Sequence, residues 1–213
     1  MEKGQHEILE RGSKFLKEPE IVAQYDNETK AGMAAGSKEF ALADFYIRKK
    51  LTAFGGIQDL IKDIDTKAPG INNIDKGNLP QGTFMALLSV GLGYALDVAT
   101  GYATNNVAAG IRYASSEYLN TLPTGLVNSE FTLLSGNKPV LKCRTKKFFA
   151  NAYADYAAEA NHENAVHLPT PKLMDYRKKI KMQLEFPDGA AAISGGAGYV
   201  EVRLQGVMLI DRV

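Results

Sequence analysis

The sequence predicts a mainly β protein: an antiparallel β-sandwich with an N-terminal helical arm and one short inserted helix. Two segments, Ile180–Phe186 and Tyr199–Gln205, alternate apolar and polar residues without a break. Strict period two is typical of a strand with one buried face and one solvated face. A third observation is the turn sequence Ser135–Pro139, which separates two further strand-like runs. These patterns indicate antiparallel strands, with the last strand built into the body of the fold.

The N-terminal part of the chain is rich in charge and poor in β-branched residues. Apolar pairs recur seven residues apart, first Ile8 and Leu9, then Phe15 and Leu16. This spacing places them on one stripe of a helix over about residues 2–17, which Pro19 ends.

A second helix is predicted to begin at Ser37, a residue type that caps helix N-termini well. The apolar residues that follow keep helical spacing: Phe40, Ala43, Ile47 and Leu51. Neither helix has a wide apolar face, so each needs a neighbour to be stable. We therefore assign residues 1–54 as a helical arm or extension and residues 55–213 as the sandwich domain.

The middle of the chain contains one long buried strand. Thr83–Leu96 is nearly all apolar and is interrupted at Gly91 and Gly93, where a bulge or bend is expected. Before it, Ile57–Ile64 fits either a short strand or a helical turn. After it, residues 98–118 are small and polar with scattered tyrosines, and they predict a long excursion between strands.

The clearest hairpin comes next. Residues 127–133 alternate, the Ser135–Pro139 turn reverses the chain, and Val140–Thr145 returns as a strand. The alanine-rich residues 150–160 predict a short helix, which Leu168–Pro171 breaks before the two closing strands.

Charge gives a weak guide to partners. The net charge is +1, so no global field draws the chain to nucleic acid or to a membrane. Two basic clusters are open to such contacts: Lys142, Arg144, Lys146 and Lys147, and Arg177, Lys178, Lys179 and Lys181. Strand alternation places Lys142, Arg144 and Lys181 at polar-facing positions, which favours an ordinary solvated surface.

The search for catalytic chemistry finds no motif. His162 and His167 are five residues apart, and on a helix that spacing turns one imidazole about 140° from the other. Gly195–Gly198 precedes a strand, whereas a phosphate-binding loop opens a helix. The single cysteine, Cys143, is expected to be a small buried hydrophobe. We expect no enzyme activity, no cofactor, and no catalytic, cofactor-binding or metal-ligating residues.

Two further patterns concern location and contacts. The first ten residues are charged, which argues against a secretory signal, and the most apolar run, Phe84–Leu96, is too short to span a membrane as a helix. The chain has ten tyrosines and no tryptophan. Six of the tyrosines lie in or beside predicted loops, where such rings suit contact with proteins or, less well without tryptophan, with glycans: Tyr94, Tyr102, Tyr113, Tyr118, Tyr153 and Tyr156.

The order of these segments resembles a known family. The segments are a helical N-terminus, Asn78–Gly82 feeding a long buried strand, Leu122–Leu134 with its Ser-Gly-Asn-Lys turn, Leu168–Leu173, Lys179–Phe186 and Val200–Val207. Over roughly residues 55–212 this pattern resembles the jelly-roll capsid proteins of tailless icosahedral bacteriophages, including lipid-containing ones. A single jelly roll needs eight strands, whereas the sequence supports five or six. The missing strands are expected within residues 51–65 and 98–120.

The resemblance implies a structural capsid subunit of a virion that self-assembles through its loops and N-terminal arm. Its partners would be copies of itself and other virion proteins, with electrostatic contact to nucleic acid or an internal membrane left open and no small-molecule substrate. It would fold and assemble in the host cytoplasm. Two alternatives stay open: a ligand- or glycan-binding β-sandwich module, such as a receptor-binding or vertex protein, and an enzyme whose motif is not recognisable.

Overall fold

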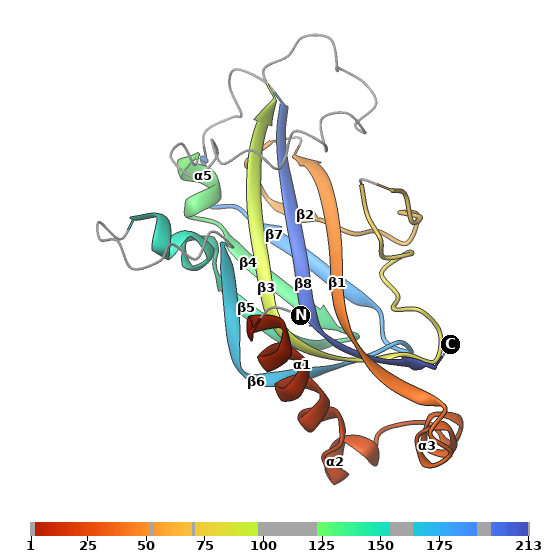
Figure 1. Ribbon diagram of the computed structural model, residues 1–213. Coiled ribbons are helices and arrows are strands. Elements are labelled where there is room, and N and C mark those ends of the chain that lie inside the picture. Colours follow the sequence, from red (N-terminus) through yellow and green to blue (C-terminus); the bar gives the residue numbers. More distant parts are fainter. Residues whose placement is uncertain are drawn as a thin grey trace.

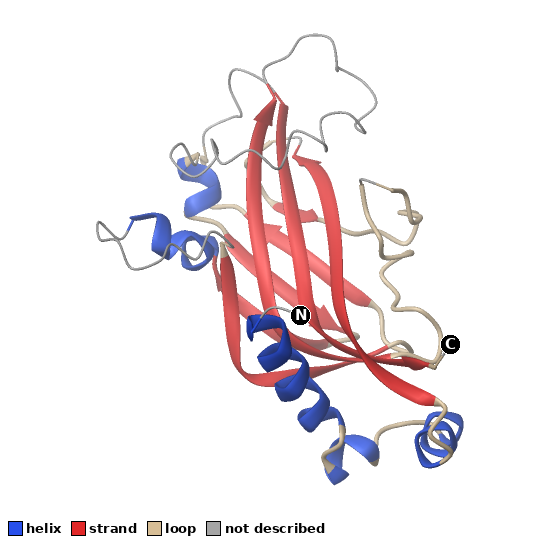
Figure 2. Cartoon of the chain, in the orientation of Figure 1, coloured by secondary structure: helices blue, strands red, loops and turns tan. Residues whose placement is uncertain are grey.

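The chain folds into two four-stranded antiparallel sheets that lie one over the other (Figures 1 and 2). The computed structural model describes residues 3–51, 53–69, 71–97, 123–153, 164–190 and 197–212. All structural statements below concern these residues. The prediction of a mainly β, sandwich-like fold is confirmed.

The first sheet has the strand order β1-β8-β3-β6. Its strands are β1 (Lys38–Leu51), β8 (Ala197–Asp211), β3 (Phe84–Asp97) and β6 (Ala165–Asp175). Strand β8 is central: it pairs with β1 from Lys38 opposite Asp211 to Leu51 opposite Gly198, and with β3 on its other side. The last strand is therefore built into the body, as the alternation predicts.

The second sheet has the strand order β2-β7-β4-β5. Its strands are β2 (Ile57–Asp59), β7 (Ile180–Glu185), β4 (Glu130–Ser135) and β5 (Lys138–Arg144). The β4–β5 hairpin is confirmed, and the ambiguous segment after residue 56 begins as a short strand. The two closing strands, β7 and β8, belong to different sheets.

A single large core, the sandwich core, fills the space between the sheets. Alternate residues of the longer strands point into it, for example Phe131 and Leu133 from β4 and Val202 and Leu204 from β8. Burying each such side chain stabilises the fold by roughly 1.5–3 kcal/mol. This core is why the period-two pattern is strict in β4, β7 and β8.

The helices lie outside the sandwich. They are α1 (Lys3–Leu16), α2 (Pro19–Val22), α3 (Asn27–Ala34), α5 (Thr124–Val127) and a 3₁₀ helix, η3 (Thr145–Tyr153). The first predicted helix is confirmed as α1, and Pro19 opens α2 at a position that tolerates proline. Of the predicted helix over 150–160, residues 150–153 belong to η3, and residues 154–160 lie outside the described residues, as does the excursion over 98–118.

The helix predicted from Ser37 is wrong, because Lys38–Leu51 forms strand β1. The inward side chains of β1 include Ala43, Ile47 and Leu51. These residues are four apart, and a step of four fits both a helix and the period of two of a strand. Strand β1 therefore lies on the N-terminal side of residue 55, where the sequence predicts the sandwich domain to start.

Strand β6 was not predicted, because Pro169 and Pro171 suggest a break. Both prolines lie inside β6, which is the outer strand of its sheet. The stretch between His167 and Lys172, which holds both prolines, is not paired with β3, and an unpaired stretch of an edge strand accommodates proline. The bulge in β3 also differs from expectation: the register shifts between Leu87 and Ser89, before the glycines at 91 and 93.

Candidate interaction surfaces

The residues singled out for chemistry do not converge. Within the described ranges, no group of three or more histidine, cysteine or acidic side chains is placed to hold a metal ion. His167 lies exposed on β6, His6 lies exposed on α1, and His162 falls outside those ranges. Burial raises the pKa of the Cys143 thiol. Cys143 is half-buried beside the sandwich core, which supports its interpretation as a hydrophobe.

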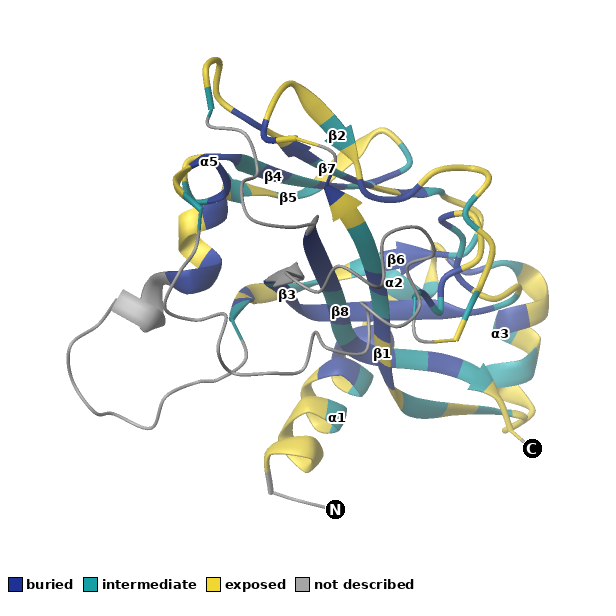
Figure 3. Cartoon of the chain, turned by 90° about the horizontal axis from the view of Figure 1, so that it is seen from above, coloured by how far each residue is buried: buried dark blue, intermediate teal, exposed yellow. Residues whose placement is uncertain are grey.

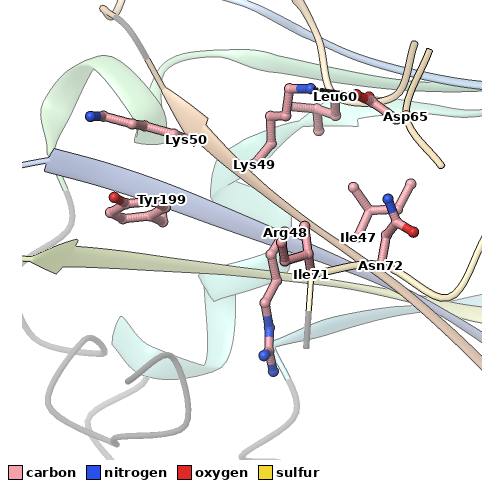
Figure 4. Close-up of a pocket in the computed structure, with 9 residues that line it drawn as sticks. All are labelled: Ile47, Arg48, Lys49, Lys50, Leu60, Asp65, Ile71, Asn72 and Tyr199. Atoms are coloured by element: carbon pink, nitrogen blue, oxygen red, sulfur yellow. Dashed lines mark hydrogen bonds and ion pairs between the residues drawn. The ribbon is translucent and has the colours of Figure 1, made fainter. Parts of the chain in front are cut away.

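A cavity of about 230 Å³ lies against the outer edge of β1 (Figure 4). Its walls come from β1, from the segment after β2, and from Tyr199. Lys49 points from β1 toward Asp65, and their Nζ and Oδ2 atoms are 3.0 Å apart, whereas Arg48 points to the opposite side of the strand. Lys49 is therefore neutralised by a carboxylate in the same wall.

The wall of this cavity also covers the middle of the free edge of β1, at residues 44–48. The backbone N–H of Arg48 donates to the Ile71 carbonyl at 2.8 Å. The Asn73 side chain accepts from the Tyr46 N–H at 2.6 Å and donates to the Asp44 carbonyl at 2.8 Å. A covered edge cannot pair with a strand of another molecule.

The opposite edge of the first sheet is protected in a different way. The Arg11 guanidinium of α1 donates to the carbonyls of Leu168 and Pro169 on β6, at 2.7 and 2.6 Å. Pro169 and Pro171 have no N–H to offer. These contacts occupy residues 44–48 of β1 and residues 168–171 of β6, which are parts of the two outer strands of the first sheet.

The outer face of β8 holds a buried ion cluster. Glu201 is only 6% exposed, and its carboxylate lies 2.6 Å from Arg48 Nε and 3.4 Å from Arg203 Nε. Nearby, the Ser89 hydroxyl donates to the Gln205 side chain at 3.0 Å. The sequence predicts a solvated face over Glu201, Arg203 and Gln205, so for Glu201 this expectation is wrong. On β7, Lys181 and Glu185 are exposed, as expected.

The lower outer face of the first sheet is covered by the N-terminal helices. A second, smaller apolar cluster, the N-terminal core, lies between these helices and the sheet. Phe15, Leu16 and Tyr25 form its helical side, and its sheet side consists of Phe84, Ala86, Leu88, Val207 and Leu209. Helix α1 approaches so closely that a Cβ on Gly12 would overlap the Val207 side chain.

Polar contacts also hold the N-terminal helices against the turn between β6 and β7. Arg177 donates to both carboxylate oxygens of Asp175 and, at 2.8 Å, to the Gln24 carbonyl after α2. Next to it, the Tyr176 hydroxyl donates to Asp26, the N-cap residue of α3, at 3.1 Å. We call these residues the latch: Gln24, Asp26, Asp175, Tyr176 and Arg177.

The latch carboxylates are held ionised. Burial opposes the charge of Asp175, which is 4% exposed, but the hydrogen bonds and the charge of Arg177 outweigh it and keep its pKa below the ordinary value. The pKa of Asp26 is also lowered, chiefly by the backbone N–H of Thr29. Both groups are therefore charged acceptors at neutral pH.

The two basic clusters have different surroundings. In the second cluster, Arg177 and Lys178 face Asp175, and Lys179 pairs with Asp63 at 2.6 Å. In the first, Lys142 pairs with Glu130 at 3.2 Å. Arg144, Lys146 and Lys147 are exposed and have no ion pair within the described residues. These three side chains are the basic patch.

The remaining surface features concern exposed apolar side chains and the tyrosines. Ile57 on β2 and Ile64 in the segment after it are 64% and 79% exposed, so two large apolar side chains lie at the surface near β2. Tyr94 lies near the end of β3, beside the predicted excursion, but its side chain is buried in the sandwich core, and burial raises its pKa to about 12. Tyr102, Tyr113, Tyr118 and Tyr156 fall outside the described residues, as does the side chain of Tyr153, so the predicted role of these tyrosines in contacts stays a prediction.

Two findings bear on classification. None of the described helices combines the length and apolar character needed to cross a membrane. No protein-family model matches the chain, and no curated protein is found to match it.

Proposed function

We propose that this chain is a structural subunit of a virion shell, built on a single jelly roll that self-assembles through its faces, its loops and its N-terminal helices. The observation that carries the proposal is the nesting of the strand pairs. β4 pairs with β5, β3 with β6, β2 with β7 and β1 with β8. A long hairpin rolled into two sheets has this pairing, and viral capsid domains are among the proteins that use it.

The contacts at the edges of the first sheet also support a subunit that assembles with other copies into a closed structure. In the first sheet, the segment around Ile71–Asn73 covers residues 44–48 of β1, and Arg11 contacts β6 beside its two prolines. Exposed edges would allow open-ended strand pairing, which leads to aggregates rather than closed assemblies. The faces remain available, including the exposed Ile57 and Ile64.

The proposed partners follow from this role. Copies of the chain and other virion proteins would contact its faces and loops. The basic patch at Arg144, Lys146 and Lys147 suits electrostatic contact with nucleic acid or with an internal membrane. The protein would act in the virion after folding in the host cytoplasm, and it would need no cofactor or small-molecule substrate.

Electron microscopy and analytical ultracentrifugation of the purified full-length chain test the proposal. We expect closed oligomers or shells with reproducible symmetry, whose subunit interfaces each bury more than about 1,000 Å². A species that remains monomeric at every accessible protein concentration, alone and with other virion proteins, would contradict it.

One observation favours a second candidate, a ligand- or glycan-binding module. The cavity beside β1 combines apolar side chains from Ile47 and Ile71 with polar groups from Asn72 and Lys49. Small-ligand sites commonly have this mixture. A glycan array with a reproducible signal that Asn72→Ala removes, on a protein that stays monomeric, would favour the binding module over the shell subunit.

A further inference from the structure

The N-terminal segment, residues 3–34, is a separate layer of this molecule. The sandwich core contains none of its residues, and both walls of that core come from β1 onward. The segment instead completes the N-terminal core on the outer face of the first sheet. Its first turns project beyond the body, where Gly4–Ile8 are exposed (Figure 3). The sandwich is therefore closed whether or not this segment lies on it.

The contacts that hold the segment are side-chain contacts on one face. No residue of α1–α3 pairs with a strand as part of either sheet. The apolar contacts centre on Phe15, Leu16 and Tyr25, and the polar ones are those of Arg11 and the latch. Surfaces of this kind fit equally well whether the two sides come from one molecule or from two.

A three-residue hinge joins the segment to the sheet. Helix α3 ends at Ala34 and β1 begins at Lys38. Gly36 has a φ of +71°, and the N–H groups of Gly36 and Ser37 return to the carbonyls of Met33 and Gly32 at 3.2 and 2.9 Å. This is a Schellman cap, a conformation that glycine adopts far more readily than other residues. Unwinding the cap would change the direction of α1–α3 relative to β1.

We propose that residues 3–34 exchange between two copies of this chain, so that the helices of each copy cover the outer face of β3 and β8 of the other. The inference deepens the proposed self-assembly and rests on it, because it names a second copy as the partner of this face. Exposing Phe84, Leu88 and Val207 to water is unfavourable, so a released segment must dock again. Protein concentration then decides whether it docks on its own sheet or on that of a neighbour.

A hinge substitution with a matched control tests this proposal. Gly36→Ala strains the positive-φ cap of the closed form but not an extended hinge. Gly82→Ala introduces the same kind of strain at a φ of +73°, remote from the hinge, and neither position has a neighbouring atom within 4 Å of an added Cβ. We expect Gly36→Ala to strengthen dimer formation by at least about fivefold in sedimentation equilibrium. Gly82→Ala should leave the dimer constant within about twofold of the unsubstituted protein.

A cross-linking measurement keeps the test decisive if Gly36→Ala folds poorly. Lys17 Nζ lies 5.0 Å from the centre of the Phe40 ring, across the boundary between segment and sheet. In a Cys143→Ser background, copies carrying only Lys17→Cys are mixed with copies carrying only Phe40→Cys, and a short bismaleimide is added. Exchange predicts cross-links between the two kinds of copy, and their yield should rise with protein concentration.

The outcomes separate this inference from the proposed function. One outcome contradicts exchange but not the shell subunit. In that case the protein assembles, the mixed copies form no cross-link, and Gly36→Ala has the same dimer constant as Gly82→Ala. If no assembly forms and no cross-link between copies appears, both are wrong. A cross-linked pair that grows with concentration and is enhanced by Gly36→Ala supports exchange.

Discussion

The sandwich core and the N-terminal core differ in the number of chain segments that form their walls. The sandwich core collects side chains from both sheets, from the segment after β2, and from α5 and η3. The N-terminal core has one wall from β3 and β8 and the other from the first three helices. Losing one element opens the smaller core completely, whereas the larger one keeps most of its walls. The difference indicates that the helical layer can be released while the sandwich persists.

The largest effect is expected in the sandwich core. Phe131 on β4 is fully buried and packs edge-on against Phe148 at 5.3 Å. Phe131→Ala should lower the free energy of unfolding by about 3–5 kcal/mol, because it leaves a cavity that both sheets line. Chemical denaturation should show one transition at lower denaturant for the whole molecule. A first transition in which only the helical layer unfolds would contradict the proposed difference between the two cores.

The matched change in the N-terminal core is Leu16→Ala. Leu16 is also fully buried, and the local cost should be about 2–4 kcal/mol. Here we expect hydrogen exchange to accelerate across α1–α3 while β4 and β7 keep their protection, since the sandwich core does not include Leu16. Equal loss of protection in β4 would show that the two cores are one cooperative unit.

The accuracy of the sequence prediction also differs from one element to another, according to whether local pattern or distant contacts decide its structure. Strands β4, β7 and β8 were predicted because one of their faces is buried and their period is strict. Strand β1 was misread because apolar residues four apart satisfy two periods, and only its pairing with β8 selects the strand. Strand β6 was missed because proline is a local signal, whereas tolerance of proline depends on an edge position that the sequence does not display.

The surfaces were less predictable than the strands. The latch brings Gln24 and Asp26 to residues 175–177, which are about 150 positions away in the chain, and no local pattern marks that approach. Glu201 looks like any polar residue of an alternating strand. Its burial depends on Arg48 reaching across from β1.

A smaller effect is expected at the latch. Arg177→Ala leaves Asp175 buried without its paired donors and removes the contact with Gln24, so docking of the helices should weaken by about 2–3 kcal/mol. Lys178→Ala is the control, because its Nζ lies 4.0 Å from Asp175 and is half exposed. Limited proteolysis should cut residues 17–37 faster in Arg177→Ala, whereas Lys178→Ala should match the unsubstituted protein. Identical cleavage of the two variants would rule out the latch.

Acid should produce the mildest change. The folded pKa values of Asp175 and Asp26 are lowered, so the stability they contribute is present above the ordinary carboxyl range and is lost as the pH falls through the lowered values. Arg177, Lys178 and Tyr176 are the other ionisable groups around Asp175. Below about pH 4 we expect faster hydrogen exchange in α2 and α3. Asp175→Asn should reduce that pH dependence, and an unchanged profile would show that the carboxylate is not the sensor.

The central place of β8 has a consequence for how the molecule is made. Strands β1 and β3 share no other neighbour, so the first sheet stays divided until Ala197–Asp211 has left the ribosome. Synthesis from the end of β3 to the end of β8 covers 114 residues, which takes on the order of 10 s. During that interval the edge of β3 that will receive β8 is unpaired. An unpaired edge is a site at which nascent chains can pair with one another, so crowding on polysomes should lower the yield of this protein.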